Sequence, residues 1–176
     1  IIISPDKKYE VVSSGNVIYD LVSGVGGFPK GRITEIVAFE STGKTSMLLA
    51  SMGKAQKEGK KCVLFDFEQC FDAYYAQHCY GLVPDNTTFF LFQPVSIEEG
   101  DALLDMLMGS DGTFDIIAFD SIACMLPEDL ITGSLTGTAQ IGLHARKISM
   151  FCHKLKKYAY IKNFAAVLTN QIKFQI

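Results

Sequence analysis

Three consecutive residues, Gly43, Lys44 and Thr45, have the types and order that bind a phosphate chain. They end the motif Ala-x-x-x-x-Gly-Lys-Thr, which differs from the P-loop pattern Gly-x-x-x-x-Gly-Lys-[Ser/Thr] only at Ala38. In such a loop, backbone N–H groups and a helix N-terminus surround phosphate oxygens. The lysine reaches the β- and γ-phosphates, and the next hydroxyl binds Mg²⁺. We predict a nucleotide site rather than a chance Gly-Lys-Thr in a surface loop, comprising Glu40, Ser41, Thr42, Gly43, Lys44, Thr45 and Ser46.

Ala38 stands where the P-loop pattern has its first glycine. If this position needs a positive φ, alanine is strained there by roughly 1 kcal/mol or more. If φ is negative, alanine is harmless.

The elements around this loop alternate between strand and helix patterns. Apolar runs separated by helical segments indicate βαβ units, so we expect an α/β fold with a mainly parallel β-sheet flanked by helices. The strand before Asp120 is almost continuously apolar, as in a strand covered on both faces. The expected strands are residues 33–39, 61–66, 88–92, 114–120 and 164–170, and the expected helices are 16–22, 45–58, 71–80, 97–108 and 143–158.

Residues 1–31 are interpreted as an approach segment and residues 32–176 as the core. The glycines and proline of residues 23–31 are typical of turns. Residues 128–142 contain several Gly, Ser and Thr, so we predict a flexible loop there. The chain starts with Ile1, and we expect it to be part of a longer protein.

Polar residues follow several of the expected strands, at the edge where α/β sheets bind ligands. Asp120 fits an acidic residue that holds the water shell of Mg²⁺; the alternative is a helix N-cap. Glu68 fits a general base that activates water; the alternative is a solvent-facing charge. Gln171 fits a sensor of the γ-phosphate, or else it is an ordinary loop amide. Tyr74 and Tyr75 stack on a nucleotide base or pack in the core.

Composition limits the remaining classes of function. The chain has 176 residues, 48% of them hydrophobic, and a mean hydropathy of +0.21, which suits one domain with a full core. Its apolar stretches are too short for a membrane span. The net charge of −3 gives no general attraction to nucleic acid, so any such site must come from local clustering. The five scattered cysteines and three histidines argue against disulfides and a zinc site, and favour a reducing, cytoplasmic compartment.

Together, these motifs resemble the ATPase core of the RecA family, bacterial DNA strand-exchange recombinases. The resemblance runs from about Ser14 to Ile172. The Glu-Ser-x-Gly-Lys-Thr loop, the Asp-x-Glu after the second strand and the final Asn-Gln-Ile make it far more specific than a P-loop alone. The matching segments are residues 31–36, 40–45, 66–68 with Asp72 and Tyr75, 119–121, 142–146 and 169–172.

The resemblance implies ATP and Mg²⁺ as ligands. Lys44 and Thr45 would bind phosphate and metal, Asp120 would support the metal, partly through water, and Glu68 would activate water. Adenine would contact Asp72 and stack on Tyr75. The residues implied to couple the γ-phosphate to DNA binding are Ser121, Asn170 and Gln171, the last also counted as catalytic with Glu68 and Lys44.

The resemblance also implies single-stranded and double-stranded DNA as partners, and self-association into a helical filament with ATP between subunits. No membrane is implied, and the expected location is the cytoplasm, at the nucleoid when active. A second DNA loop would begin just after Gln171, and the N-terminal assembly segment and C-terminal domain are expected outside these residues. The first DNA-binding loop would lie in residues 131–141, and the implied DNA contacts are Gly133, Ser134, Thr136, Gly137, Ile141 and Arg146.

Departures from the family pattern leave alternatives open. Besides Ala38, His153 stands where the family commonly has an arginine facing DNA, and the first loop has no Lys or Arg. The basic residues around residues 146–162 could follow phosphates or form an ordinary solvated face. Two other functions remain: an ATP-binding regulatory paralogue with little hydrolysis, and a hexameric helicase on the same core.

Overall fold

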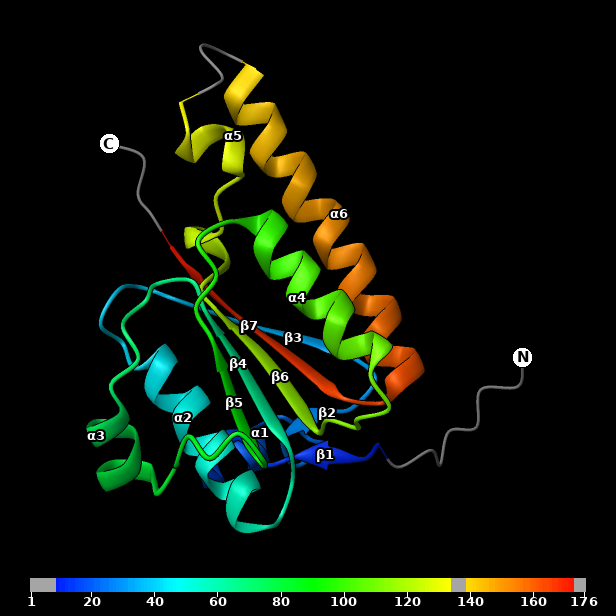
Figure 1. Cartoon of the computed structure of the whole chain (residues 1–176). Helices are drawn as coiled ribbons and strands as arrows, with labels where there is room; N and C mark the ends of the chain where they lie inside the picture. The colour runs from blue at the N-terminus through cyan, green and yellow to red at the C-terminus, as the bar shows by residue number, and fades with distance from the viewer. Residues whose placement is uncertain (1–8, 134–138, 173–176) are drawn as a thin grey trace.

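The computed structural model describes residues 9–133 and 139–172, and its centre is a five-stranded parallel sheet (Figure 1). The strand order is β3-β7-β6-β4-β5, and every neighbouring pair is parallel. The predicted α/β class is therefore confirmed, and the sheet is wholly parallel. The strands are β3 (Ile33–Ala38), β4 (Cys62–Asp66), β5 (Phe89–Phe92), β6 (Ile116–Asp120) and β7 (Ala165–Gln171).

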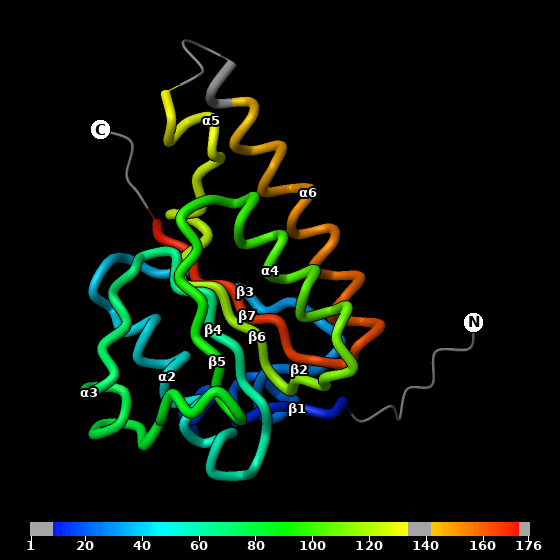
Figure 2. Tube along the Cα trace, viewed as in Figure 1, coloured from blue at the N-terminus to red at the C-terminus, as the bar shows by residue number. Residues whose placement is uncertain are grey.

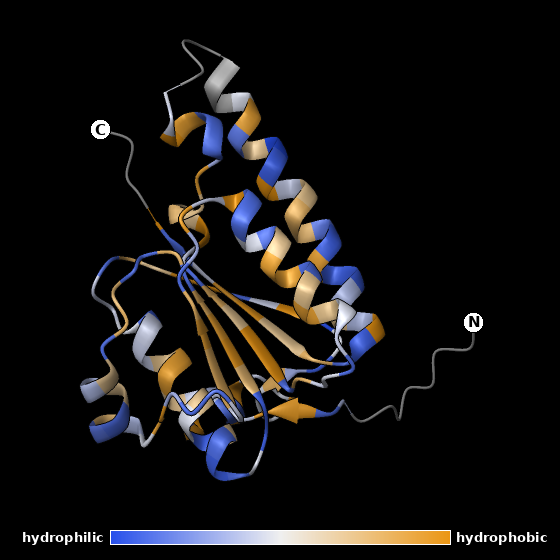
Figure 3. Ribbon diagram, in the orientation of Figure 1, coloured by the Kyte–Doolittle hydropathy of each residue, from blue (hydrophilic) through white to orange (hydrophobic). Residues whose placement is uncertain are grey.

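Helices cover both faces of this sheet (Figures 1 and 2). Helices α4 (Ile97–Gly109) and α6 (Ala139–Lys162) lie on one face, and α2 (Lys44–Lys57) lies on the other. Because successive strand side chains point to opposite faces, each central strand contributes to two cores. Phe65 and Phe119 pack under α4 and α6, whereas Leu64 and Ala118 pack under α2. Figure 3 shows the resulting apolar strands between amphipathic helices.

Local sequence sets where most of the helices begin. The side chain of Asn16 caps α1 (Val17–Val22), and Ser96 caps α4 by accepting a hydrogen bond from the N–H of Glu99. Glu99 in turn accepts from the N–H of Val95, the residue before the cap, an arrangement close to a capping box.

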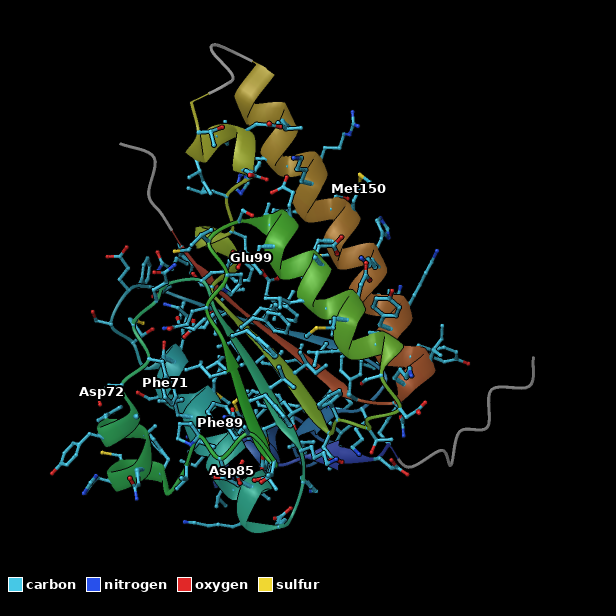
Figure 4. All side chains as sticks on the ribbon, viewed as in Figure 1. Phe71, Asp72, Asp85, Phe89, Glu99 and Met150 are labelled. Carbon is cyan, nitrogen blue, oxygen red and sulfur yellow. The ribbon has the colours of Figure 1, made fainter. Side chains whose placement is uncertain are left out.

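The helix predicted over residues 71–80 has a different form in the structure. Asp72 caps a short α3 (Ala73–Tyr75), which continues as a π-helix (Ala76–Tyr80). Gly81, with a φ of 67°, ends the π-helix in the left-handed conformation. Phe71, just before Asp72 (Figure 4), packs on Phe89 of β5 with ring centroids 5.7 Å apart. The prediction was right about a helical segment and wrong about its uniform geometry.

The prediction of a flexible loop over residues 128–142 is wrong at both ends of that range, where the structure has helices. Residues Glu128–Ile131 form α5, and α6 already begins at Ala139, four residues before the predicted start. Helix α5 follows Pro127 and has Glu128 and Asp129 in its first turn, both favourable at a helix N-terminus. Contacts with α4 also hold it, because the N–H of Glu128 donates to Glu98. Composition alone did not reveal these tertiary contacts.

The first described residues contain a small antiparallel sheet that the sequence did not predict. Strand β1 (Val11–Val12) pairs with β2 (Phe28–Pro29). Elsewhere in the chain, a 3₁₀ turn (Ile122–Cys124) that the sequence also did not predict follows β6. Val12 and Phe28 are buried in the core beneath α2. Gly27 between them has a φ of 147°, and a Cβ there would meet the carbonyl oxygen of Val12 at 2.3 Å. The close approach of the two strands therefore requires glycine.

Candidate nucleotide site

The phosphate loop connects β3 to α2 without strain at Ala38. Ala38 is the last residue of β3, pairs in register with Gln171, and is not among the residues with a positive φ. The positive φ values fall instead on Ser41, at 56°, and Gly43, at 91°. Alanine is therefore compatible with the backbone at the position where the P-loop pattern has its first glycine.

The N-terminus of α2 has open hydrogen-bond donors. Unlike α1, α3 and α4, helix α2 has no side-chain cap on its first N–H groups. Lys44 folds back over the loop, where its Nζ donates to the carbonyl oxygen of Phe39 at 2.7 Å. These donors and the ammonium group form a positive recess that suits an anion.

Asp120, at the carboxyl end of β6, is buried next to Thr45 of α2. The Thr45 hydroxyl donates to its Oδ2 at 2.6 Å, and the Thr169 hydroxyl donates to its Oδ1. Burial raises the pKa of Asp120, the two hydroxyls oppose that rise, and the nearby carboxylates of Glu68 and Asp66 add to it. Only 2% of Asp120 is exposed, and the charge of this buried carboxylate has no cationic partner among the groups that shift its pKa.

Glu68 lies next to Asp120, with three side chains directed at one of its carboxylate oxygens. Its Oε1 accepts hydrogen bonds from the Ser121 hydroxyl at 2.6 Å, the Gln171 amide at 3.1 Å and the Cys124 thiol at 3.8 Å. Within the part of the chain that the structure describes, all of the hydrogen bonds found for this carboxylate go to Oε1. Oε2 is therefore left to accept a proton from another group.

A cavity of about 440 Å³ joins these parts. It is open enough for a polyphosphate, and both the phosphate loop and the candidate base line it. Gln171, at the end of β7, closes one side. The lining residues are Glu40, Ser41, Gly43, Lys44, Thr45, Ser46, Glu68 and Gln171.

Some residues predicted for the site lie beside the cavity rather than in its wall. The Thr42 hydroxyl donates to the carbonyl oxygen of Phe39 and so stabilises the loop. Ser121 is fully buried behind Glu68. Asn170 donates to Glu35 on β3, and its side-chain oxygen accepts from the N–H of Gln171.

Asp72 caps α3, and the two predicted base-stacking tyrosines, Tyr74 and Tyr75, belong to this helix. Asp72 uses one oxygen to cap α3 through the N–H of Tyr75. Tyr74 stacks on His78, with centroids 3.8 Å apart, and remains 72% exposed. Tyr75 faces Tyr80 instead, with the two hydroxyl oxygens 3.1 Å apart. Core packing, the alternative for these tyrosines, is wrong for both, because both are exposed.

The basic residues of α6 divide into two groups. Lys147 forms ion pairs with Glu98 and Asp129, and Lys154 with Asp101 at 2.8 Å and Asp105 at 2.6 Å. These two lysines attach α6 to neighbouring helices through carboxylate partners. The exposed basic residues of α6 are Arg146, His153, Lys156, Lys157 and Lys162.

Part of the predicted DNA loop lies outside the described residues. Ser134, Thr136 and Gly137 fall there, and so do residues 173–176 after Gln171. Ile141 belongs to α6, but its side chain is not described. Gly133 is described, with a φ of 68° just after α5.

The chain matches the family model described as the RecA N-terminal domain over residues 3–176. It is 38% identical over 169 residues to Protein RecA of Aquifex pyrophilus, an alignment that covers 96% of this chain and 47% of that protein. The chain belongs to the RecA family. Protein RecA of Aquifex aeolicus is also 38% identical, covering 96% of this chain and 48% of the relative, and that of Gluconacetobacter polyoxogenes is 35% identical, covering 98% and 48%.

This chain therefore spans about half the length of the RecA proteins that it matches. Within the described residues, every helix is too short or too polar to cross a bilayer. The same residues contain no cluster of three or more His, Cys, Asp or Glu that would hold a metal by itself.

The residues present fit ATP with Mg²⁺, the ligands that the family resemblance implies. The uncapped start of α2 and the Lys44 ammonium suit phosphates, and the recessed Asp120 carboxylate with the Thr45 hydroxyl suits a hard cation. Sequence reasoning missed two members of this polar network, Thr169 and Cys124. Thr169 follows an apolar run directly, a signal that could have been used; Cys124 had no such signal, because the 3₁₀ turn after β6 places it.

Proposed function

We propose that the whole protein of which this chain is part is a DNA-dependent ATPase. In this proposal it forms a filament on single-stranded DNA, exchanges strands with a duplex, and serves recombination and DNA repair in the cytoplasm, at the nucleoid. The supporting observation is the cavity itself. One space of about 440 Å³ is lined by the phosphate loop, by the Glu68 carboxylate and by Gln171.

In the proposed mechanism, this chain's residues bind and orient the triphosphate. The open N–H groups of α2 and the Lys44 ammonium hold the phosphates, and Lys44 exchanges its contact with the Phe39 carbonyl for one with phosphate. Thr45 and Asp120 would hold Mg²⁺, Asp120 partly through water, and the ion would supply positive charge where negative charge develops on phosphate oxygens. Glu68 accepts the proton of the attacking water at Oε2, while donors to Oε1 fix the carboxylate's orientation.

Gln171 supplies the coupling to DNA in this proposal. Its amide donates to Glu68, and its backbone lies at the end of β7, where the chain leaves the sheet. A change in the path of the following residues would move this amide and alter the orientation of Glu68. ATP drives such a change only by binding the two states unequally. Arg146 and the other exposed basic residues of α6 supply phosphate contacts.

The two alternatives have less support. The regulatory paralogue rested on strain at Ala38, and Ala38 has no positive φ. A hexameric helicase would assemble as rings, whereas the proposed recombinase forms filaments on DNA. Electron microscopy of the whole protein with ATP and single-stranded DNA separates these assemblies, and rings alone would contradict the proposal.

The deciding experiment measures ATP hydrolysis by the whole protein with and without single-stranded DNA. DNA should stimulate hydrolysis by the wild type. Glu68→Gln should lower that rate by about 10²- to 10⁴-fold and retain ATP binding, whereas Lys44→Ala should lose binding. Glu58→Gln is the matched control, because Glu58 is an exposed residue at the far end of α2. An ATP hydrolysis rate that is the same with and without DNA, or one that Glu68→Gln does not lower, would refute the proposal.

A further inference from the structure

The π-helix of residues Ala76–Tyr80 places two tyrosines together that an α-helix would keep apart. Side chains three and four residues apart share one side of an α-helix, whereas residues five apart do not. The wider i→i+5 turn brings Tyr75 and Tyr80 onto the same side. Their rings meet edge to face, with centroids 5.6 Å apart and planes at 83°. Such π turns occur frequently at functional sites.

Tyr80 also connects this pair to the phosphate loop. The Ser46 side chain acts to lower the pKa of the Tyr80 hydroxyl group, against the opposing effects of Tyr75 and burial, and Ser46 lines the phosphate cavity. The Tyr75 hydroxyl lies 3.1 Å from that of Tyr80. A chain of three hydroxyl groups therefore runs from the first turn of α2 to the ring of Tyr75. Tyr74, which stacks on His78, has no part in this chain.

The backbone around Tyr80 is held as well as its side chain. A Cβ at Gly53 of α2 would meet the carbonyl oxygen of Tyr80 at 2.3 Å, so the two helices touch at the backbone. After Tyr80, the N–H of Gly81 donates to Gln77, and that of Leu82 donates to Ala76. Ala76 and Leu82 are fully buried beneath this turn. Tyr80 is thus fixed relative to α2, while Tyr75 remains 43% exposed.

We propose that Tyr80 is a positioning residue of the nucleotide site: it orders the exposed Tyr75 ring, and that ring stacks on the base of a nucleoside triphosphate bound at the phosphate loop. An exposed tyrosine would otherwise sample several rotamers, and ordering it on binding would cost affinity. Because Tyr80 already holds the Tyr75 ring in the free protein, little of this ordering cost remains when the nucleotide binds. The inference rests on the proposed nucleotide binding and extends it to a residue that does not itself touch the nucleotide.

The test compares two probes, ATP and inorganic tripolyphosphate, each with Mg²⁺, by titration calorimetry of the whole protein. Tripolyphosphate has no base, so its affinity reports the phosphate loop alone. Tyr80→Phe keeps the ring and removes only the hydroxyl group. It should weaken ATP binding by about three- to tenfold, the range for one lost hydrogen bond, and leave tripolyphosphate binding unchanged.

Two further variants sharpen the result. Tyr160→Phe removes an exposed tyrosine hydroxyl on α6 and should change neither affinity. Ser46→Ala breaks the same chain of hydroxyl groups at its other end, so its loss of ATP affinity should not add to that of Tyr80→Phe. Unchanged ATP binding in Tyr80→Phe, or equal losses for both probes, would overturn the inference. A wild type that binds neither probe would instead refute the proposed function.

Discussion

Two aspartates at the two ends of β6 show opposite responses to their surroundings. Asp115 precedes the strand, pairs with the Lys30 ammonium at 2.5 Å and accepts the N–H of Lys61 at 2.9 Å. Burial alone would raise the pKa of Asp115, but Lys30 and Lys61 outweigh it, and the pKa lies below its usual value. Asp120 ends the same strand with hydroxyl partners and two nearby carboxylates, and its pKa is raised.

The difference separates a carboxylate that has a cationic partner in the structure from one that we propose supports a metal ion. A buried charge is costly unless a partner compensates for it. Asp115 has its cation within the fold, so it fastens the amino end of β6 to its neighbours. Among the described residues, no cationic group is a cause of the pKa shift of Asp120, and a cation brought by a ligand would supply that compensation. The basic residues of α6 show the same contrast between charges with and without a partner in the structure. Lys147 and Lys154 pair with carboxylates of the protein, whereas Arg146 is exposed.

The strongest test of this comparison exchanges each aspartate for its amide. Asp120→Asn should lower Mg²⁺-dependent ATP hydrolysis by about 10- to 100-fold, because the neutral side chain no longer supports the metal. Asp115→Asn should leave hydrolysis close to the wild-type rate. Steady-state assays over a range of Mg²⁺ concentrations measure both. Equal losses in the two variants would remove the distinction between the two ends of β6.

The converse effect should appear in stability. Asp115→Asn leaves the largely buried Lys30 without its partner and should lower the free energy of unfolding by about 1–3 kcal/mol. Urea denaturation of the metal-free protein measures this change. Asp120→Asn should cost less there than Asp115→Asn, since it removes an uncompensated charge. The opposite order would show that Asp120 is mainly structural.

The two aspartates should also respond to acidification in different pH ranges, because the pKa of Asp115 is lowered and that of Asp120 is raised. The lowered pKa of Asp115 stabilises the fold above its unfolded value of 3.8, and this contribution is lost as pH falls through the folded-state pKa. The stability gap between wild type and Asp115→Asn should therefore shrink below about pH 4. The raised pKa of Asp120 means that protons compete with Mg²⁺ at a higher pH than for a free aspartate. Mg²⁺ affinity, measured by titration, should fall on acidification in the wild type and change less in Asp120→Asn.

The smallest effect concerns the two kinds of basic residue on α6. Arg146→Ala should weaken binding to single-stranded DNA several-fold and reduce the slope of log affinity against log salt by about 0.7, the value for one phosphate contact. Lys154→Ala should leave that slope unchanged, because its ammonium pairs with Asp101 and Asp105. Fluorescence anisotropy at several salt concentrations makes the comparison. A reduced slope in Lys154→Ala would show that these ion pairs open on DNA.

The sequence by itself determined the class of fold and the chemistry of the phosphate loop. Continuous apolar runs such as residues 114–120 are typical of strands buried on both faces, and the structure has a parallel sheet between helices. Lys44, Thr45, Glu68 and Gln171 could all be proposed from their positions just after strands, and all four line one cavity. These predictions depend on local pattern, because parallel strands deliver their carboxyl ends to a single edge.

The tertiary structure alone decided which polar groups are compensated. Lys147 and Lys154 looked in the sequence like part of a basic surface, but side chains of α4 lying about fifty residues earlier neutralise them. The same holds for Tyr80, whose proposed role depends on a π turn that brings its hydroxyl group within 3.1 Å of that of Tyr75. Long-range contacts of this kind leave no periodic trace in a single sequence. The sequence gives the charge of each residue, whereas the fold decides which residue lies close enough to neutralise that charge.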